Sequence, residues 1–156
     1  MNEQYVEKIV GFPIFKGFTS AGARMLLDRG EVKEYSEGEV LFREGDFPTV
    51  VVLVLTGKMH VFVERQGREL VLTDVEAGAI LGELALLCGI PRSASVRASE
   101  NSAVLQWGAT AFRQLLLSDV SLSQQIFKES LRTLIEKEKS LIDSLTRLQG
   151  GGKLVE

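Results

Sequence analysis

The sequence predicts a mainly β fold, a double-stranded β-helix (jelly-roll) barrel with N-terminal helices and a long C-terminal helix. Between residues 31 and 108 the apolar segments are short, rich in Val and Leu, and separated by turns that contain Gly, a pattern typical of an antiparallel barrel. On both sides of this stretch the apolar residues recur at helical spacing instead. The length of 156 residues fits one such domain.

Composition excludes several classes of protein. Hydrophobic residues make up 45% of the chain, enough for a packed core, and the net charge of -3 gives no general basic surface for nucleic acid. The single cysteine, Cys88, cannot form an internal disulfide, which suits a reducing compartment. The first residues show no basic-then-apolar pattern of the kind found in signal sequences, and the longest apolar runs are far shorter than a membrane span. We therefore expect a cytoplasmic protein without a membrane partner.

The N-terminal segment, residues 1–30, is expected to be helical, with Thr19-Ser20 positioned to cap its second helix. In the barrel segment, residues 31–108, the continuous apolar run 50–55 is typical of a strand buried on both faces. Residues 58–65 and 68–75 flank a tight Gln66-Gly67 turn and predict a hairpin. In its first strand, we expect Met59, Val61 and Val63 on one face and His60, Phe62 and Glu64 on the other.

The C-terminal segment, residues 109–148, predicts a short helix over 110–117 and a long one over 121–148. Apolar residues of the long helix follow a heptad pattern with one polar interruption, at Glu138. The seam consists of Phe127, Leu131, Leu134, Leu141, Leu145 and Leu148. We expect this helix to act as a lid and to pair with its twin in a homodimer. Three glycines from Gly150 lead us to expect a flexible tail over 149–156.

The segment 82–96, GELALLCGIPRSASV, combines an acid, an arginine and two glycines within eleven residues. After Gly82, residues 83–87 can form a short helix whose free N–H groups favour a phosphate. Arg92 supplies a donor fork suited to phosphate oxygens, and Ser93 offers one more donor. Glu83 has only acceptors and suits a hydroxyl such as a sugar 2′-OH. The segment therefore predicts a site for a nucleotide or a sugar phosphate.

These residues resemble a known family. GELALL at 82–87 followed by PRSASV at 91–96 is similar to the phosphate-binding cassette of cyclic nucleotide-binding domains, such as those of the catabolite activator and the regulatory subunit of protein kinase A. YSEGEVLFREGD at 35–46 and LVLTGKMHV at 53–61 resemble strands of the same family, in the same order. The resemblance runs from about residue 12 to 140 and implies the barrel fold and a cyclic nucleotide ligand, cAMP or cGMP.

The resemblance implies a role for each matching position. Glu83 would accept from the ribose 2′-OH, and Arg92 would neutralise the cyclic phosphate. Backbone N–H groups would contact the phosphate oxygens, and Asp46 matches an acid that pairs with the arginine in some relatives. The expected phosphate contacts lie at Gly82, Leu84, Ala85, Ser93 and Ala94.

Further positions concern the base. Val61, Leu72 and Thr73 match residues that line the base or sugar side of the pocket. An ungapped alignment with the catabolite activator places Lys137 and Glu138 where that protein has hydroxyl residues that reach the adenine. Lys137 and Glu138 either contact the base or belong to a solvated helix face, and we favour the solvated face.

We therefore expect a cyclic nucleotide sensor that transmits binding through its long helix. The alternative is a barrel that works by pairing, without a ligand. A catalytic role is not expected, because a metal enzyme on this barrel would need clustered histidine and carboxylate ligands, the chain has one histidine, and no nucleophile–base arrangement occurs. Relatives that regulate transcription carry a helix-turn-helix after the long helix, and we expect no DNA-binding domain in this chain.

Overall fold

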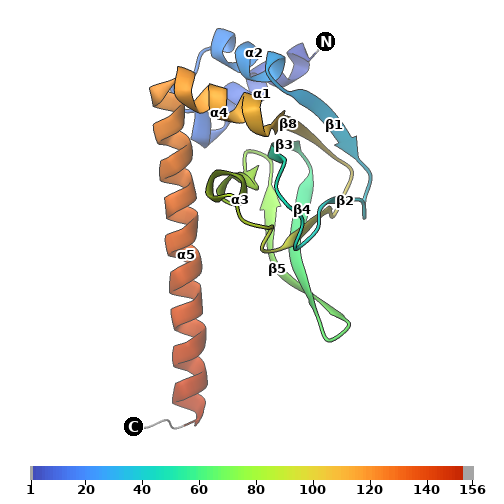
Figure 1. The fold of residues 1–156 in the computed structure, drawn as a ribbon, viewed down its shortest axis with the longest axis vertical. Helices are drawn as coiled ribbons and strands as arrows, with labels where there is room; N and C mark the ends of the chain where they lie inside the picture. The colour runs from blue at the N-terminus through green and yellow to red at the C-terminus, as the bar shows by residue number, and fades with distance from the viewer. Residues whose placement is uncertain (1, 153–156) are drawn as a thin grey trace.

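The computed structural model describes residues 2–152, and the chain begins in a small cluster of helices. These are η1 (Glu3–Tyr5), α1 (Val6–Gly11), η2 (Pro13–Phe15) and α2 (Ser20–Asp28). The predicted cap of α2 is confirmed, because the Thr19 hydroxyl accepts a hydrogen bond from the backbone N–H of Gly22 at 3.1 Å. The cluster lies at one end of the molecule, above the strands (Figure 1).

The predicted jelly-roll barrel is confirmed. Eight strands form two antiparallel four-stranded sheets, ordered β1-β8-β3-β6 and β2-β7-β4-β5. One short helix, α3 (Glu83–Cys88), interrupts the barrel between β6 and β7. The strands are β1 (Glu31–Tyr35), β2 (Val40–Phe42), β3 (Val50–Thr56), β4 (Lys58–Arg65), β5 (Arg68–Glu76), β6 (Ile80–Leu81), β7 (Ser95–Ala98) and β8 (Ser102–Gly108).

Strand β3 is buried on both faces, as its apolar run predicted. One face, with Leu53 and Leu55, packs in a cluster with the N-terminal helices and with apolar residues from the C-terminal helices, between residues 112 and 126. The other face, with Val52 and Val54, packs inside the barrel. Since successive side chains of a strand point to opposite faces, a strand between two cores has no polar position.

The predicted hairpin of β4 and β5 is confirmed. Its turn uses left-handed backbone at both central residues, with φ of 56° at Gln66 and 74° at Gly67. On the face of β4 expected to carry His60, Phe62 and Glu64, Phe62 is only 3% exposed. The centroid of its ring lies 4.6 Å from the guanidinium carbon of Arg97, which covers Phe62.

The C-terminal segment forms α4 (Ala109–Ser118) and α5 (Val120–Gly152). The first turns of α5 are anchored by Leu122 and Ile126, which are 1% and 2% exposed. The remainder extends well past the barrel (Figure 1). The expected start of a tail at residue 149 is wrong, because an exposed helix can include glycines at about 1 kcal/mol each. Residues 153–156 of that tail lie outside the described residues.

None of the helices that the structure describes combines the length and apolar character needed to cross a bilayer.

Candidate functional site

The site begins at Gly82, the residue that precedes α3. Its φ of 85° is left-handed, a conformation that favours glycine. A Cβ atom on this residue would lie 2.3 Å from Nη1 of Arg92 and 3.2 Å from the Phe42 ring. Glycine is therefore required twice here, for the turn and for the close approach of the arginine.

Arg92 is buried against this turn. Its side chain is 6% exposed, although it carries a charge. Nη1 donates to the carbonyl of Gly82 at 2.9 Å, and Nη2 donates to the carbonyl of Val50 at 2.7 Å. The guanidinium carbon lies 3.8 Å from the centroid of the Phe42 ring, a cation–π contact. Backbone oxygens and an aromatic face thus hold the group rigidly in place.

The charge of Arg92 has no carboxylate in direct contact. Burial lowers the pKa of this guanidinium, and the negative charges of Asp46 and Glu83 oppose that shift without reversing it. The expected ion pair with Asp46 is not formed, because Asp46 is exposed and the guanidinium is turned inward. The two residues are joined through the backbone instead, where the Arg92 N–H donates to the Asp46 carbonyl at 2.8 Å.

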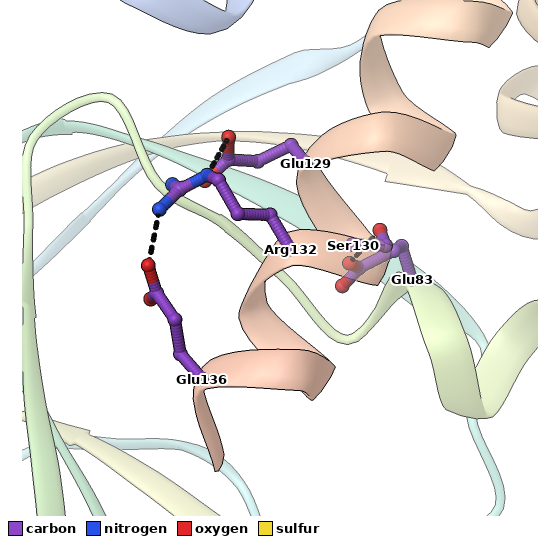
Figure 2. Close-up of polar contacts among 5 residues, drawn as sticks. All are labelled: Glu83, Glu129, Ser130, Arg132 and Glu136. Carbon is purple, nitrogen blue, oxygen red and sulfur yellow. Dashed lines mark hydrogen bonds and ion pairs between the residues drawn. The ribbon is translucent and has the colours of Figure 1, made fainter. Parts of the chain in front are cut away.

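Glu83 is the first residue of α3 and is half-buried. The hydroxyl of Ser130, on α5, donates to Oε2 of Glu83 at 2.5 Å. Figure 2 shows this bond joining the two helices. The predicted sugar-binding acid is therefore present at the expected turn, and one of its oxygens is engaged by the long helix.

The backbone around Arg92 offers N–H groups. Leu84 and Ala85 lie in the first turn of α3, where N–H groups have no partner within the helix, and Gly82 has no side chain to cap them. Ser93 and Ala94 lie on the other side of Arg92, in the bend that leads to β7. The expected phosphate contacts thus belong to two segments, the turn and first residues of α3 and the bend that follows Arg92.

The expected lining residues lie on the hairpin. Val61 of β4 and Thr73 of β5 are directly opposite each other and share a face, which packs toward the barrel interior at Val61. Leu72 differs, because the register shifts between Val61 and Phe62 and leaves Leu72 without a cross-strand partner. It is 58% exposed in this bulge.

Lys137 and Glu138 are exposed on α5, about two helical turns beyond Ser130. Nearer to Ser130, Arg132 hydrogen-bonds to the carboxylates of Glu129 and Glu136, on the side of the helix away from Glu83 (Figure 2). The structure does not bring Lys137 and Glu138 into contact with the other site residues, so their role as base contacts stays a prediction.

Two site residues were missed from the sequence. Phe42, under the guanidinium, has no signal that separates it from an ordinary core residue. Ser130 did have one, because it continues the buried stripe of Leu122 and Ile126 at intervals of four residues. A hydroxyl on a core-facing stripe needs a buried partner, and Glu83 provides it.

The comparisons agree with the geometry. The model of the cyclic nucleotide-binding domain family matches residues 32–119. A cAMP-dependent protein kinase regulatory subunit from Blastocladiella emersonii is 33% identical over 114 residues, which is 72% of this chain and 27% of that protein. The chain thus spans about a quarter of the length of this relative.

Solved structures share the fold. The catabolite activator protein of Thermus thermophilus superposes with a TM-score of 0.76 at 27% identity, covering 86% of this chain and 63% of that one. A cAMP-binding acyltransferase from Mycobacterium smegmatis superposes with a TM-score of 0.62 at 29% identity, covering 73% of this chain and 36% of that one. The similar proteins thus include a kinase regulatory subunit, a catabolite activator and an acyltransferase.

Proposed function

Because the chain belongs to the cyclic nucleotide-binding domain family, we propose that it is a regulatory sensor in which residues 31–108 bind the nucleotide and residues 109–148 transmit the binding. The names of two relatives contain cAMP, so cAMP is the first ligand to test and cGMP the second. We further propose that this chain acts by binding, with no catalytic residue of its own.

One observation carries the proposal. Arg92 is a buried cation without an ion pair among the described residues. Burying a charge is costly unless an opposite charge compensates it. The N–H groups of Leu84 and Ala85, in the first turn of α3, favour negative charge as well. A small monoanion such as a cyclic phosphate ester would satisfy both the buried guanidinium and the N–H groups.

Glu83 supplies the second half of the recognition. Glu83 directly follows Gly82, and Arg92 donates to the Gly82 carbonyl, so the carboxylate and the guanidinium are held at the same turn. A carboxylate accepts from a hydroxyl and repels a second phosphate, which favours a nucleoside with a free sugar hydroxyl and one ring-closed phosphate. The side of the barrel at Val61 and Thr73 then faces the sugar or the base.

The test is calorimetric titration of the protein with cAMP and cGMP. The Arg92→Ala variant is expected to lose about 2–5 kcal/mol of binding free energy, because the bound phosphate loses its counter-charge. Arg24→Ala is the matched control, since Arg24 is an exposed arginine that pairs with Glu3 far from the site. Equal affinities of Arg92→Ala and the parent protein would place the ligand elsewhere, and no binding of either nucleotide to the parent protein would refute the proposal.

A second function is favoured by a separate observation. All six residues of the predicted heptad seam are exposed along α5, from Phe127 at 44% to Leu148 at 71%. An apolar stripe of this length is expected to be covered by a partner. The chain would then be an interaction module that pairs through α5 with a second copy, with or without a nucleotide.

A thermal melt separates the two functions. A ligand at 100 times its dissociation constant stabilises a protein by about 2.7 kcal/mol, which is a clear shift of the melting temperature. We expect this shift with at least one cyclic nucleotide. If the protein forms dimers and neither cAMP nor cGMP changes its melting temperature, the result would favour the interaction module.

We also propose a cytoplasmic location, on the basis of Cys88, which is an exposed free thiol. Such a thiol persists most readily in a reducing compartment. Fractionation of cells that express the protein tests this, and recovery outside the cytoplasm would contradict it.

A further inference from the structure

Ser130 is the last buried residue of α5. It is 5% exposed, whereas nearly all the residues that follow it on the helix are exposed. Its hydroxyl donates to Oε2 of Glu83 at 2.5 Å, a bond between the long helix and the turn that holds Arg92 (Figure 2). A buried hydrogen bond to a charged acceptor is stronger than one between neutral groups. This hydrogen bond therefore holds α5 to α3 at the point where α5 extends away from the rest of the protein.

We propose that Ser130 is a latch that occupies Glu83 in place of the ligand's sugar hydroxyl, and that a ribonucleotide must displace it. The inference rests on the proposed function, since it concerns the same site. It makes Ser130 a residue that sets both affinity and the discrimination between a ribose and a 2′-deoxyribose. It also links ligand binding to the position of α5 through one identified bond.

The chemistry of the two donors supports competition. A serine hydroxyl and a sugar 2′-OH are both aliphatic alcohols that donate one hydrogen to a carboxylate oxygen. Competition requires that the 2′-OH approach Oε2, the oxygen that Ser130 already engages, because the two oxygens of a carboxylate can otherwise accept from both donors. A ligand that lacks the 2′-OH has nothing to exchange for Ser130 and leaves the latch closed.

The construction of α5 supports release. The chain is extended at Asp119, between α4 and α5, so the two helices are not one rigid rod. The Asp119 carboxylate caps the start of α5 by accepting from the N–H of Leu122 at 2.9 Å. Leu122 and Ile126 anchor the first two turns, and Ser130 is the next contact. Breaking the bond to Glu83 thus shortens the anchored part of the helix by one turn.

A supporting role for Ser130 predicts the opposite change in ribonucleotide affinity when its hydroxyl is removed. If Ser130 instead positions Glu83 so that its other oxygen receives the ligand, removal of the hydroxyl weakens binding of the ribonucleotide. If Ser130 is a latch, removal of its hydroxyl frees the Glu83 carboxylate and strengthens binding of the ribonucleotide. Affinity for cAMP alone therefore distinguishes the two roles, and 2′-deoxy-cAMP serves as the internal reference because it cannot use Glu83.

The experiment titrates the Ser130→Ala variant with cAMP and with 2′-deoxy-cAMP. We expect cAMP to bind about two- to tenfold more tightly than to the parent protein, which is the range of one net hydrogen bond, and 2′-deoxy-cAMP to bind equally to both. Ser140→Ala is the matched control, an exposed serine further along the same helix. Unchanged or weaker binding of cAMP to Ser130→Ala overturns the latch.

A second readout follows the helix itself. In the parent protein, cAMP is expected to speed amide hydrogen exchange over residues 127–134, and Ser130→Ala is expected to show the faster exchange before ligand is added. Exchange that cAMP leaves unchanged in the parent protein overturns the latch even if the variant fails to fold. A parent protein that binds no cyclic nucleotide refutes the proposed function, whereas binding without either effect refutes only the latch.

Discussion

At the scale of single residues, the site depends on the absence of a side chain at Gly82. Both the left-handed turn and the approach of Arg92 need the space that a Cβ atom would fill. The arginine in turn depends on the carbonyl of that glycine, to which it donates. The turn and the buried cation therefore form one unit, and a change in either residue disturbs the other.

The Gly82→Ala variant is expected to be destabilised by about 3 kcal/mol and to lose cyclic nucleotide binding. Left-handed strain accounts for about 1–2 kcal/mol, and displacement of a buried, hydrogen-bonded guanidinium accounts for the rest. Denaturant unfolding measures the loss of stability, and calorimetry measures the loss of cyclic nucleotide binding.

Gly89 provides the matched control. It is also left-handed, with φ of 68°, but a Cβ atom there would meet nothing within 4 Å. Gly89→Ala is expected to show the strain alone, about 1–2 kcal/mol, with binding intact. Equal free energies of unfolding for Gly82→Ala and Gly89→Ala would mean that Arg92 moves away from the new methyl group without loss of stability.

At the scale of elements, ion pairs tie the β4–β5 hairpin to the rest of the barrel. Arg65, next to the turn, contacts the carboxylate of Glu44 at 3.0 Å, and Arg97 of β7 contacts Glu69 of β5 at 2.5 Å. The hairpin is otherwise weakly covered, because β5 is an edge strand that is exposed along nearly its whole length. The register of the hairpin, which sets Val61 opposite Thr73, decides the face on which both lie.

The Glu44 pair gives a prediction in pH. A hydrogen bond from Arg65 lowers the pKa of Glu44 below its ordinary value of 4.5. The folded form therefore gains a stabilisation that is present above the unfolded pKa and is lost as the pH falls through the lower, folded pKa. A carbon-detected NMR titration of the Glu44 carboxylate is expected to give a midpoint below 4.5.

Arg65→Gln is the control for this titration, because it keeps a polar side chain and removes the charge. The midpoint of Glu44 is expected to move upward in that variant. A midpoint that does not differ between the two proteins would show that the pair does not form in solution.

At the scale of the whole molecule, α5 is longer than the body that it packs against. Its 33 residues extend about 50 Å, and its apolar anchors lie only in the first turns. Beyond Ser130 the apolar side chains are exposed, and Ile135 and Ile142 widen the stripe of the predicted seam at a spacing of seven residues. This is the surface that a second copy of the helix would cover in our proposal.

Leu141→Asp is expected to convert the dimer to a monomer, because it places a charge in the middle of the apolar seam. Sedimentation velocity measures the change. Leu117→Asp is the matched control, since Leu117 is 84% exposed on α4 and lies outside the seam. A parent protein that sediments as a monomer at every concentration would refute pairing through α5.

The sequence predicted individual elements most reliably where the local pattern alone decides the structure. The cap at Thr19, the turn at Gln66-Gly67 and the doubly buried strand β3 were all predicted, because each depends on a few neighbouring residues. The buried ring of Phe62 and the bulge at Leu72 were not predicted. Both depend on β7 and on strand register, which join residues that are distant in the sequence.

The strand and turn pattern of the sequence was enough to predict the class of the fold. The resemblance of residues 82–96 to a known family then pointed to the acid, the arginine and the glycine of the site. Only the tertiary structure decided what each group touches. It turned Arg92 toward two carbonyls instead of Asp46, and it brought Ser130 to Glu83 across 47 residues of chain. The physical reason is that a side chain's partner is set by the packing of distant elements, on which local spacing carries no information.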